Sequence, residues 1–166
     1  MIKAIVNASP LIALSIIRQF NLLKQIFNEI YIPKAVADEI LAAESKKHFA
    51  VNELKQAINN DIFKVYTVKD SKFVGKLFGK LHKGELEVIV GAKELDVDFA
   101  VIDEIAARRL AKILGVDTIG TIGILMLAKE KGYIPHLKPL LLELKSNKFR
   151  LSDKLMKKIL LDVKEK

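Results

Sequence analysis

The sequence predicts a three-layer α/β/α fold, in which helices cover both faces of a central and mainly parallel sheet. Short apolar runs alternate with longer segments of helical periodicity along the chain. No Pro/Gly-rich or low-complexity linker interrupts this alternation. With 166 residues, 51% of them hydrophobic, the chain is most simply one domain with a well-filled core, and we expect a single domain over 1–166.

The first half of the chain contains three predicted strands with helices between them. Residues 3–6 form an apolar strand, and the helix after it is predicted over about 11–18. Ser9 is a suitable N-cap for that helix, and Pro10 suits a first helical position. The further elements expected are a helix over 22–27, a strand over 30–32, helices over 33–41 and 51–59, a strand over 63–68 and a helix from 70 or 71 to about 79.

The second half continues the alternation and ends in helices. Residues 99–102 are four consecutive apolar residues, which is typical of a buried strand in a parallel sheet. Gly115 is placed as the C-cap of the helix before it. The expected elements are helices over 85–95 and 105–114, a strand over 116–119, an apolar helix that follows 120–123 and reaches about 131, and helices near 138–146 and 152–164.

Polar side chains follow two of the predicted strands. Asp103 and Glu104 come directly after the strand at 99–102, and Asn7 follows the first strand. Carboxylates inside a buried strand would cost much desolvation energy, so they are expected at its carboxyl end, where open α/β sheets hold ligands. Glu85 and Glu39 lie in predicted helices. A charge at a helix N-terminus explains Glu85 equally well, and a solvent-facing helix position explains Glu39.

Several acids at one sheet edge repel one another, and a bound Mg²⁺ or Mn²⁺ offsets that repulsion through oxygen ligands. Such a site can activate water and neutralise the charge of a phosphodiester. The three histidines are far apart in the sequence and show no ligand spacing. The residues alone therefore indicate a hard-metal site and no particular enzyme.

Five segments resemble a known family when their order and spacing are taken together. Asn7, Glu39, Glu85 and Asp103 are separated by 32, 46 and 18 residues. The segments are 5–12 (IVNASPLI), 32–40 (IPKAVADEI), 84–87 (GELE), 101–111 (VIDEIAARRLA) and 114–123 (LGVDTIGTIG). The chain over about 1–150 thereby resembles the PIN-domain superfamily, in particular a group of archaeal and bacterial predicted nucleic-acid-binding proteins. The helical segment over 150–166 looks like a C-terminal extension of that family.

The resemblance implies a metal-dependent endoribonuclease, a hydrolase that uses Mg²⁺ or Mn²⁺, often as the toxin of a toxin–antitoxin pair. The catalytic, metal-facing quartet carried over by position is Asn7, Glu39, Glu85 and Asp103. The implied metal ligands are Asp103, Glu85, Glu39 and Glu104, and Glu87 is a further neighbour that can substitute. Ser9 is implied to hold the first-strand residue in place and to lie in the substrate site, with Arg108 or Thr121 meeting phosphate.

Asn7 is a departure from this resemblance, because most PIN nucleases carry Asp at that position. An amide oxygen can ligate a hard metal but brings no charge. The site then has three carboxylates in place of four unless Glu104 turns inward. The alternative is therefore a PIN-fold module that binds RNA or a protein partner with weak or absent catalysis.

Charge and composition bound the partners and the compartment. The net charge is +8 and the pI is about 9.5, and residues 129–166 carry +6 of that charge. This favours a polyanion such as RNA or an acidic, antitoxin-like protein, although a solubilising surface accounts for it equally. Lys154, Lys157 and Lys158 form one such basic row. With no cysteine and no membrane-spanning run, we expect a cytoplasmic protein without disulfides or membrane association, and self-association into a homodimer is a further expectation.

Overall fold

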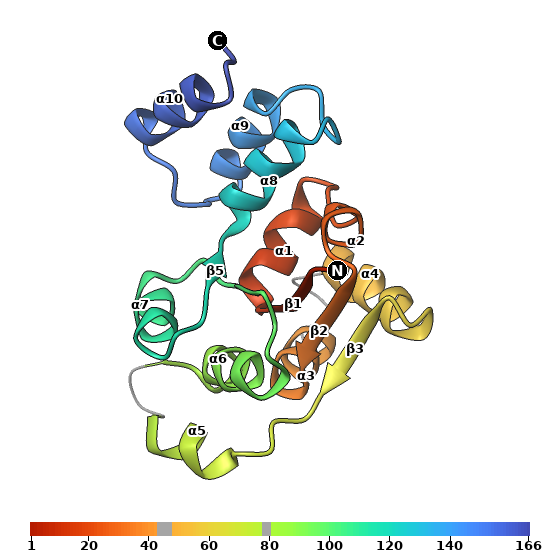
Figure 1. The fold of residues 1–166 in the computed structure, drawn as a ribbon. Coiled ribbons are helices and arrows are strands. Elements are labelled where there is room, and N and C mark those ends of the chain that lie inside the picture. The colour runs from red at the N-terminus through yellow and green to blue at the C-terminus, as the bar shows by residue number, and fades with distance from the viewer. Residues whose placement is uncertain (43–47, 78–80) are drawn as a thin grey trace.

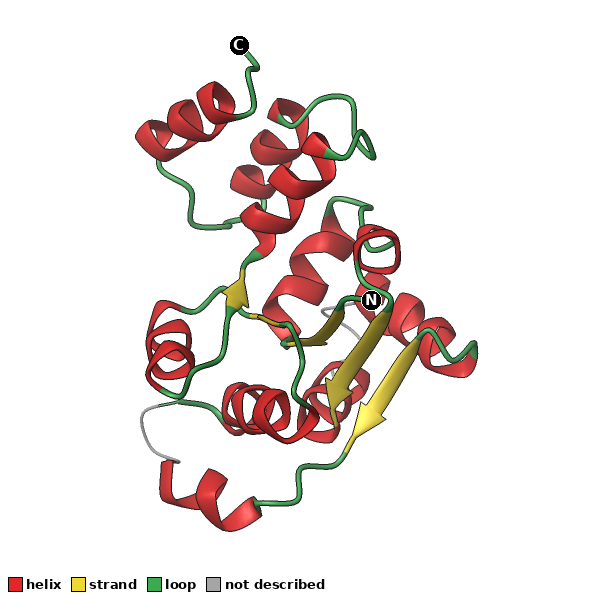
Figure 2. Ribbon diagram, viewed as in Figure 1, coloured by secondary structure: helices red, strands yellow, loops and turns green. Residues whose placement is uncertain are grey.

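A computed structural model describes residues 1–42, 48–77 and 81–166 of the chain. It contains one five-stranded sheet in the order β3-β2-β1-β4-β5, and all neighbouring strands are parallel. Figure 2 shows β2 and β3 side by side with their arrowheads in the same direction. The predicted parallel sheet is therefore confirmed. The strands are β1 (Lys3–Val6), β2 (Glu29–Pro33), β3 (Phe63–Tyr66), β4 (Phe99–Val101) and β5 (Thr118–Ile119).

Helices cover both faces of this sheet, as predicted for a three-layer α/β/α fold (Figure 1). Helix α6 packs on β1, β2 and β4 and contacts α5 and α7, whereas α1 contacts α4 and α8. Helix α3 contacts both α1 and α6. The helices in the described residues are α1 (Ala8–Ile16), α2 (Leu22–Ile26), α3 (Lys34–Ala42), α4 (His48–Asn59), α5 (Ser71–Leu77), α6 (Lys83–Leu95), α7 (Ile105–Ile113), α8 (Thr121–Glu130), α9 (Lys138–Ser146) and α10 (Asp153–Asp162).

The central strands are buried on both faces, which explains their continuous apolar sequences. Ala4, Ile5 and Val6 of β1 are fully enclosed. The edge strand β3 differs, because Phe63 is buried and Lys64 is exposed. Polar groups that follow the central strands must therefore emerge at the edge of the sheet.

The start of α1 differs from the prediction. The helix begins at Ala8 with Asn7 in the N-cap position, so Ser9 is not its N-cap and Pro10 is its third residue. Proline is tolerated there because the first amide groups of a helix have no helical partner. The chain thus passes directly from β1 into α1, and Asn7 occupies the junction.

The strands β3 and β5 are shorter than predicted. Strand β3 ends at Tyr66, and β5 begins only at Thr118. The segment before β5 closes the end of α7 instead, because the N–H of Val116 donates to the carbonyl of Ala111 at 2.8 Å. Gly115, at φ +77°, supplies the left-handed turn that this closure needs, as its predicted capping role requires.

Side-chain caps define two other helix starts. The carboxylate of Asp70 accepts the N–H of Phe73 at 3.1 Å and caps α5, and Ser152 accepts the N–H of Leu155 at 3.1 Å and caps α10. The last two residues of the helix predicted to reach about 79 lie outside the described residues, whose second range ends at Leu77.

The carboxylate of Glu94 ties α6 to the segment after β3. It accepts hydrogen bonds from the N–H of Lys69 at 2.8 Å, the N–H of Asp70 at 2.9 Å and the hydroxyl of Tyr66 at 2.8 Å. Burial raises the pKa of Glu94, but the hydrogen bonds lower it by more, so the pKa lies below its ordinary value. This carboxylate therefore contributes stability in its charged form.

Helix α6 approaches β1 closely at Gly91. A β-carbon at this position would stand 2.7 Å from Cδ1 of Ile5. Such a distance is too short for two carbon atoms, so the helix can lie this close to the sheet only with glycine there. The position of α6 matters because its first turn carries Glu85.

Helices α8, α9 and α10 form a group at one end of the molecule, beyond β5 (Figure 1). Glu165 accepts the N–H groups of Leu137 and Lys138 at 2.8 and 2.9 Å and pairs with Lys129 at 3.4 Å. Burial raises the pKa of Glu165, but these partners lower it below its ordinary value. Lys145 pairs with Asp153, so both ends of α10 are tied to neighbouring elements.

Candidate active site

The carboxyl ends of β1 and β4 lie side by side at the centre of the sheet. The chain runs from β1 to β2 on one side and continues from β4 to β5 on the other, which makes this a topological switch point. Open α/β sheets hold their ligands at such points. The N–H of Asn7 donates to the carbonyl of Val101 at 3.0 Å, so Asn7 is fixed beside the end of β4. Asp103 and Glu104 follow the same strand end.

A cavity of about 400 Å³ lies at this edge, and we call it the acid cavity. Three of its side chains are carboxylates, contributed by Glu39 on α3, Glu85 on α6 and Glu104 before α7. No lysine or arginine of the described ranges lines it. The acid cavity is lined by Asn7, Ala8, Ser9, Glu39, Leu81, His82, Gly84, Glu85, Glu104 and Ala106.

Asn7 and Glu39 border the same space above Gly84. A β-carbon on Gly84 would stand 3.6 Å from Oε2 of Glu39 and 3.9 Å from Oδ1 of Asn7. Asn7 is buried, and its amide has no hydrogen-bond partner among the residues that the structure describes. The same β-carbon would stand 3.2 Å from Cγ2 of Val36, so Gly84 lets α6 lie close to a methyl group and to the two oxygens that border the acid cavity.

Glu85 also serves the helix on which it lies. Its Oε2 accepts the N–H of His82 at 3.2 Å, which confirms that it caps the start of α6. His82 also lines the acid cavity, although the spacing of the histidines did not predict a ligand role for it. The sequence signal that could have placed His82 here is local: an N-cap residue and a glutamate three positions later form a capping pair.

The acid cavity concentrates negative charge. Within the described residues, neither Glu39, Glu85 nor Glu104 forms an ion pair. Their oxygens and the Asn7 amide are the donors that Mg²⁺ or Mn²⁺ prefers. In those same ranges, no three acidic or histidine side chains are already gathered closely enough to hold one ion. The donor chemistry fits a hard divalent cation, and the side chains must converge to bind it.

Asp103 lies beside the acid cavity and is held by the first residue of α8. Its Oδ1 accepts the N–H of Thr121 at 2.7 Å, and its Oδ2 accepts the Thr121 hydroxyl at 2.6 Å. Thr121 is fully buried, whereas Asp103 is half-buried. Each carboxylate oxygen has a second lone pair, so Asp103 can accept these bonds and still bind a further partner.

Arg108 reaches the same place from α7. A β-carbon on Gly120 would stand 2.8 Å from Oδ1 of Asp103 and 2.9 Å from Nη1 of Arg108. Gly120 thus leaves room for the carboxylate and the guanidinium, which both lie next to it. Arg108 is exposed and can meet a phosphate, whereas the enclosed Thr121 directs its hydroxyl to Asp103.

A second cavity of about 680 Å³ adjoins the acid cavity, and we call it the basic groove. Ser9 and Glu104 line both cavities. Ser9 is exposed, and its hydroxyl makes no hydrogen bond to Asn7 in the described structure. The basic groove is lined by Ser9, Asp103, Glu104, Ile105, Arg108, Gly120, Ile122, Gly123, Met126, Lys148, Phe149, Arg150, Leu155, Lys158, Ile159 and Asp162.

Glu87 belongs to a different part of the molecule. Its buried carboxylate accepts the N–H of Ala35 at 3.2 Å and lies 3.9 Å from the ammonium group of Lys83. It lines a separate cavity with Lys34 and Asp38. Glu87 therefore fixes the start of α3 and does not join the residues of the acid cavity.

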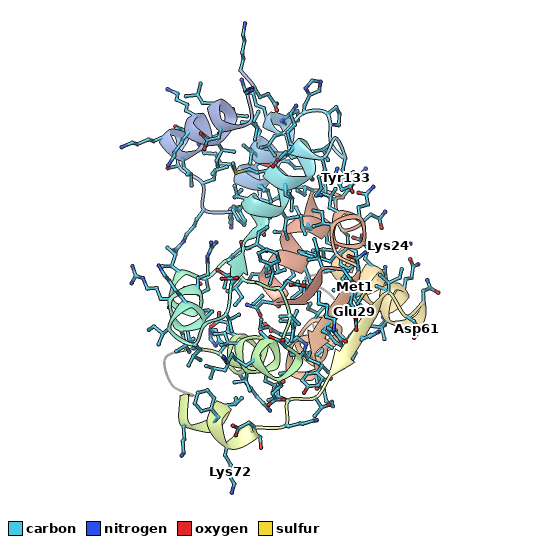
Figure 3. All side chains as sticks on the ribbon, viewed as in Figure 1. Met1, Lys24, Glu29, Asp61, Lys72 and Tyr133 are labelled. Atoms are coloured by element: carbon cyan, nitrogen blue, oxygen red, sulfur yellow. The ribbon has the colours of Figure 1, made fainter. Side chains whose placement is uncertain are left out.

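Positive charge is spread unevenly over the surface. Figure 3 shows Lys24 and Lys72 projecting outward from different parts of the ribbon. Four cations instead gather along the basic groove. They are Arg108, Lys148, Arg150 and Lys158. The part of the chain that the structure describes has no helix with the length and apolar character needed to cross a bilayer.

The fold is a doubly wound α/β domain with a cavity lined by carboxylates at its switch point. The chain belongs to the PIN-domain family, because a family model described as a PIN domain matches residues 3–165. The resemblance found in the sequence is thereby confirmed. A comparison with curated proteins finds no match. PIN domains are generally nucleases that act on nucleic acid with divalent metals, and this chain has that nuclease-type fold.

Proposed function

We propose that this chain is a metal-dependent endoribonuclease that uses Mg²⁺ or Mn²⁺ to cleave single-stranded RNA. The observation that carries the proposal is the acid cavity, with three carboxylates and an amide at the switch point of the sheet and no cation lining it among the described residues. Membership of a family of nucleases supports the same conclusion independently.

Glu39, Glu85 and Glu104 would hold the divalent cation, and Asn7 adds an uncharged oxygen from the floor of the acid cavity. Asp103 adds a further carboxylate from the side of the basic groove. When bound, the cation supplies an activated water and neutralises phosphodiester charge. In this arrangement, Glu104 replaces the charge that an aspartate at position 7 would have brought.

Other residues of the chain act on the substrate or on the ligands. The exposed guanidinium of Arg108 binds a phosphate beside Asp103. Ser9, which lines both cavities, donates a hydrogen bond to the same strand. Thr121 is a positioning residue, because its buried hydroxyl holds Asp103 in place.

The experiment measures Mn²⁺-dependent cleavage of mixed-sequence single-stranded RNA, with EDTA as the metal-free reference. Glu39→Gln and Glu104→Gln keep the size of the side chain and remove its charge, so each should lower the rate by at least about tenfold. Glu130→Gln removes an exposed charge at the end of α8, away from both cavities, and should keep the wild-type rate. A wild-type rate in the combined variant Glu39→Gln/Glu104→Gln would overturn the proposal.

A second candidate function is RNA binding without cleavage, and Asn7 favours it because its amide brings no charge to the metal. This candidate predicts RNA retention that weakens steeply with salt and no cleavage with any metal. Asn7→Asp separates the two functions. Cleavage by this variant but not by the wild type would identify the natural protein as a binding module.

The proposed ribonuclease is one cytoplasmic domain over 1–166, with 150–166 as its C-terminal helical extension. We propose that it acts as a toxin held in check by an antitoxin-like protein and that it can form a homodimer. Co-expression with the protein of the neighbouring reading frame, followed by affinity purification and light scattering, tests both associations. Recovery of the chain alone and as a monomer would contradict them.

A further inference from the structure

The basic groove continues directly from the acid cavity. Ser9 and Glu104 line both, so a ligand that extends beyond the acid cavity past these residues enters the basic groove. The groove has a volume of about 680 Å³, which exceeds the 400 Å³ of the acid cavity. Any polymeric substrate cut in the acid cavity needs such a path for the rest of its chain.

The basic groove is lined by four cations and by the carboxylates of Asp103, Glu104 and Asp162, and three of the four cations come from the segment 148–158. Asp103 and Glu104 lie at the end that adjoins the acid cavity, whereas Lys148 and Arg150 come from the segment between α9 and α10. Lys158 adds a cation from α10. This arrangement gives a polyanion a favourable surface outside the acid cavity while leaving the acids free to bind a cation.

An aromatic residue lies between Lys148 and Arg150 in the segment that joins α9 to α10. Phe149 is half-buried, lines the basic groove and packs against the hydrophobic core. Its N–H donates to the carbonyl of Leu144 at 3.0 Å, after Lys148 adopts a left-handed conformation with φ +67°. The three consecutive side chains are thereby presented to the groove from a fixed turn. Cations that flank an aromatic ring are typical of surfaces that bind single-stranded nucleic acid.

One face of α10 completes the groove. Leu155, Lys158, Ile159 and Asp162 line it, at the spacing expected of one helical face. Lys154 and Lys157 do not line it, so the basic row of the sequence divides between two faces. Because Glu165 and the Lys145–Asp153 pair fasten the ends of α10, this wall exists before any ligand binds.

We propose that the basic groove holds the segment of single-stranded RNA that flanks the scissile phosphate. Lys148, Arg150 and Lys158 bind its phosphates, and Phe149 stacks on one of its bases. The proposal rests on the proposed function for the nature of the polymer. Continuity with the acid cavity favours RNA over an acidic protein segment, since a protein partner would need no path leading to the metal ligands.

The test measures RNA binding by fluorescence anisotropy in EDTA, so that affinity is separated from cleavage. The probe is a labelled mixed-sequence RNA of about 12 nucleotides, close to the length that such grooves accommodate. Lys148→Glu/Arg150→Glu should weaken binding by at least about tenfold and lower the slope of log affinity against log salt by about 2. Phe149→Ala should weaken binding by about 5-fold to 100-fold.

Lys154→Glu/Lys157→Glu is the matched control, because it makes the same change in net charge on the same C-terminal region outside the groove. It should bind within about threefold of the wild type if local contacts and not net charge decide affinity. Circular dichroism melts verify that all variants are folded. Equal loss of affinity in both double variants, or no loss in either, would overturn the groove proposal.

Two further outcomes separate this proposal from the proposed function. Loss of binding in Lys148→Glu/Arg150→Glu, together with no cleavage by the wild type in Mn²⁺, would support the RNA groove and overturn the ribonuclease. Unchanged binding in that variant, together with Mn²⁺-dependent cleavage by the wild type, would support the ribonuclease and overturn the RNA groove. If poly-glutamate binds as tightly as RNA and shows the same loss, the groove takes an acidic protein segment and the RNA assignment is wrong.

Discussion

The hydroxyl of Thr121 provides a direct test of how the sheet edge is built. Thr121→Val exchanges this hydroxyl for a methyl group of similar size and removes the 2.6 Å bond to Oδ2 of Asp103. The 2.7 Å bond from the backbone N–H to Oδ1 remains. Because Thr121 is fully buried, no water replaces the lost hydroxyl from its own side.

A hydrogen bond to a charged group contributes about 1.5–3 kcal/mol to the free energy of unfolding. Asp103 is half-buried, so water can satisfy part of its Oδ2, and we expect a loss near the lower limit, about 1.5 kcal/mol. In a chain of this size, that loss lowers Tm by about 3–6 °C. RNA affinity in EDTA should not change, whereas cleavage should fall because Asp103 is less firmly positioned.

Urea titrations and thermal melts followed by circular dichroism measure the effect. Thr67→Val is the matched control, since Thr67 is exposed after β3, and its unfolding free energy should change by less than about 0.5 kcal/mol. In a double-mutant cycle with Asp103→Asn, the two changes should couple by at least about 0.5 kcal/mol. The stabilising role of the Thr121–Asp103 hydrogen bond would be refuted by two results together. These are a urea midpoint of Thr121→Val equal to that of the wild type, and additive effects in the cycle.

Three further predictions address the core, the pH dependence and the metal. Gly91→Ala brings a β-carbon to 2.7 Å from Ile5 and should cost about 1–3 kcal/mol of unfolding free energy in urea titrations. Gly75→Ala meets no atom of the described residues within 4 Å and should cost nothing. Glu94 has a lowered pKa, so its stabilisation is present above the ordinary carboxyl pKa and is lost as pH falls through the lowered one; Glu94→Gln should flatten the decline of Tm below about pH 4.5. Asn7→Asp adds a carboxylate to the acid cavity and should tighten Mn²⁺ binding by about tenfold in calorimetry, with unchanged RNA affinity in EDTA.

The sheet and its polar edge were predictable because they depend on local sequence. Apolar runs such as 3–6 and 99–102 can be buried on both faces only as central strands, and the polar residues after them must emerge at one edge. The position of Asn7 and of the acids after β4 at the sheet edge therefore follows from the sequence. The pairing of β1 with β4 then brings them together.

The direction of each acid was not predictable from the sequence. Adjacent side chains of an extended chain point to opposite sides, so only one of Asp103 and Glu104 is expected to line the acid cavity, although both line the basic groove. Which of them does so depends on Thr121, 18 residues further along, which binds Asp103. The exclusion of Glu87 has a similar cause, because its partner is the N–H of Ala35 on another helix.

The basic groove could not be located by sequence for a different reason. Net charge identified 129–166 as basic, but a helix such as α10 presents its lysines to more than one side. Only the packing of Met156 and Leu160 into the core decides that Lys158 lines the groove and Lys154 does not. Charge patterning thus indicated a polyanion partner without indicating where that partner lies.

Glu104 connects the two halves of the site. Its carboxylate lies between a cavity with no cation among its described lining residues and a groove lined by four cations and three carboxylates, so positive charge increases on the groove side. In the proposed function, Glu104 repels a phosphate by itself, so a divalent cation bound beside it would be needed for a phosphate to reach this boundary. Asn7 stands where most PIN nucleases carry aspartate, so the acid cavity has one negative charge fewer at this position. Glu104 supplies a negative charge where the two cavities meet. We therefore expect the proposed metal to lie nearer to the exposed Glu104, and so nearer to the RNA strand in the basic groove, than it would with aspartate at position 7.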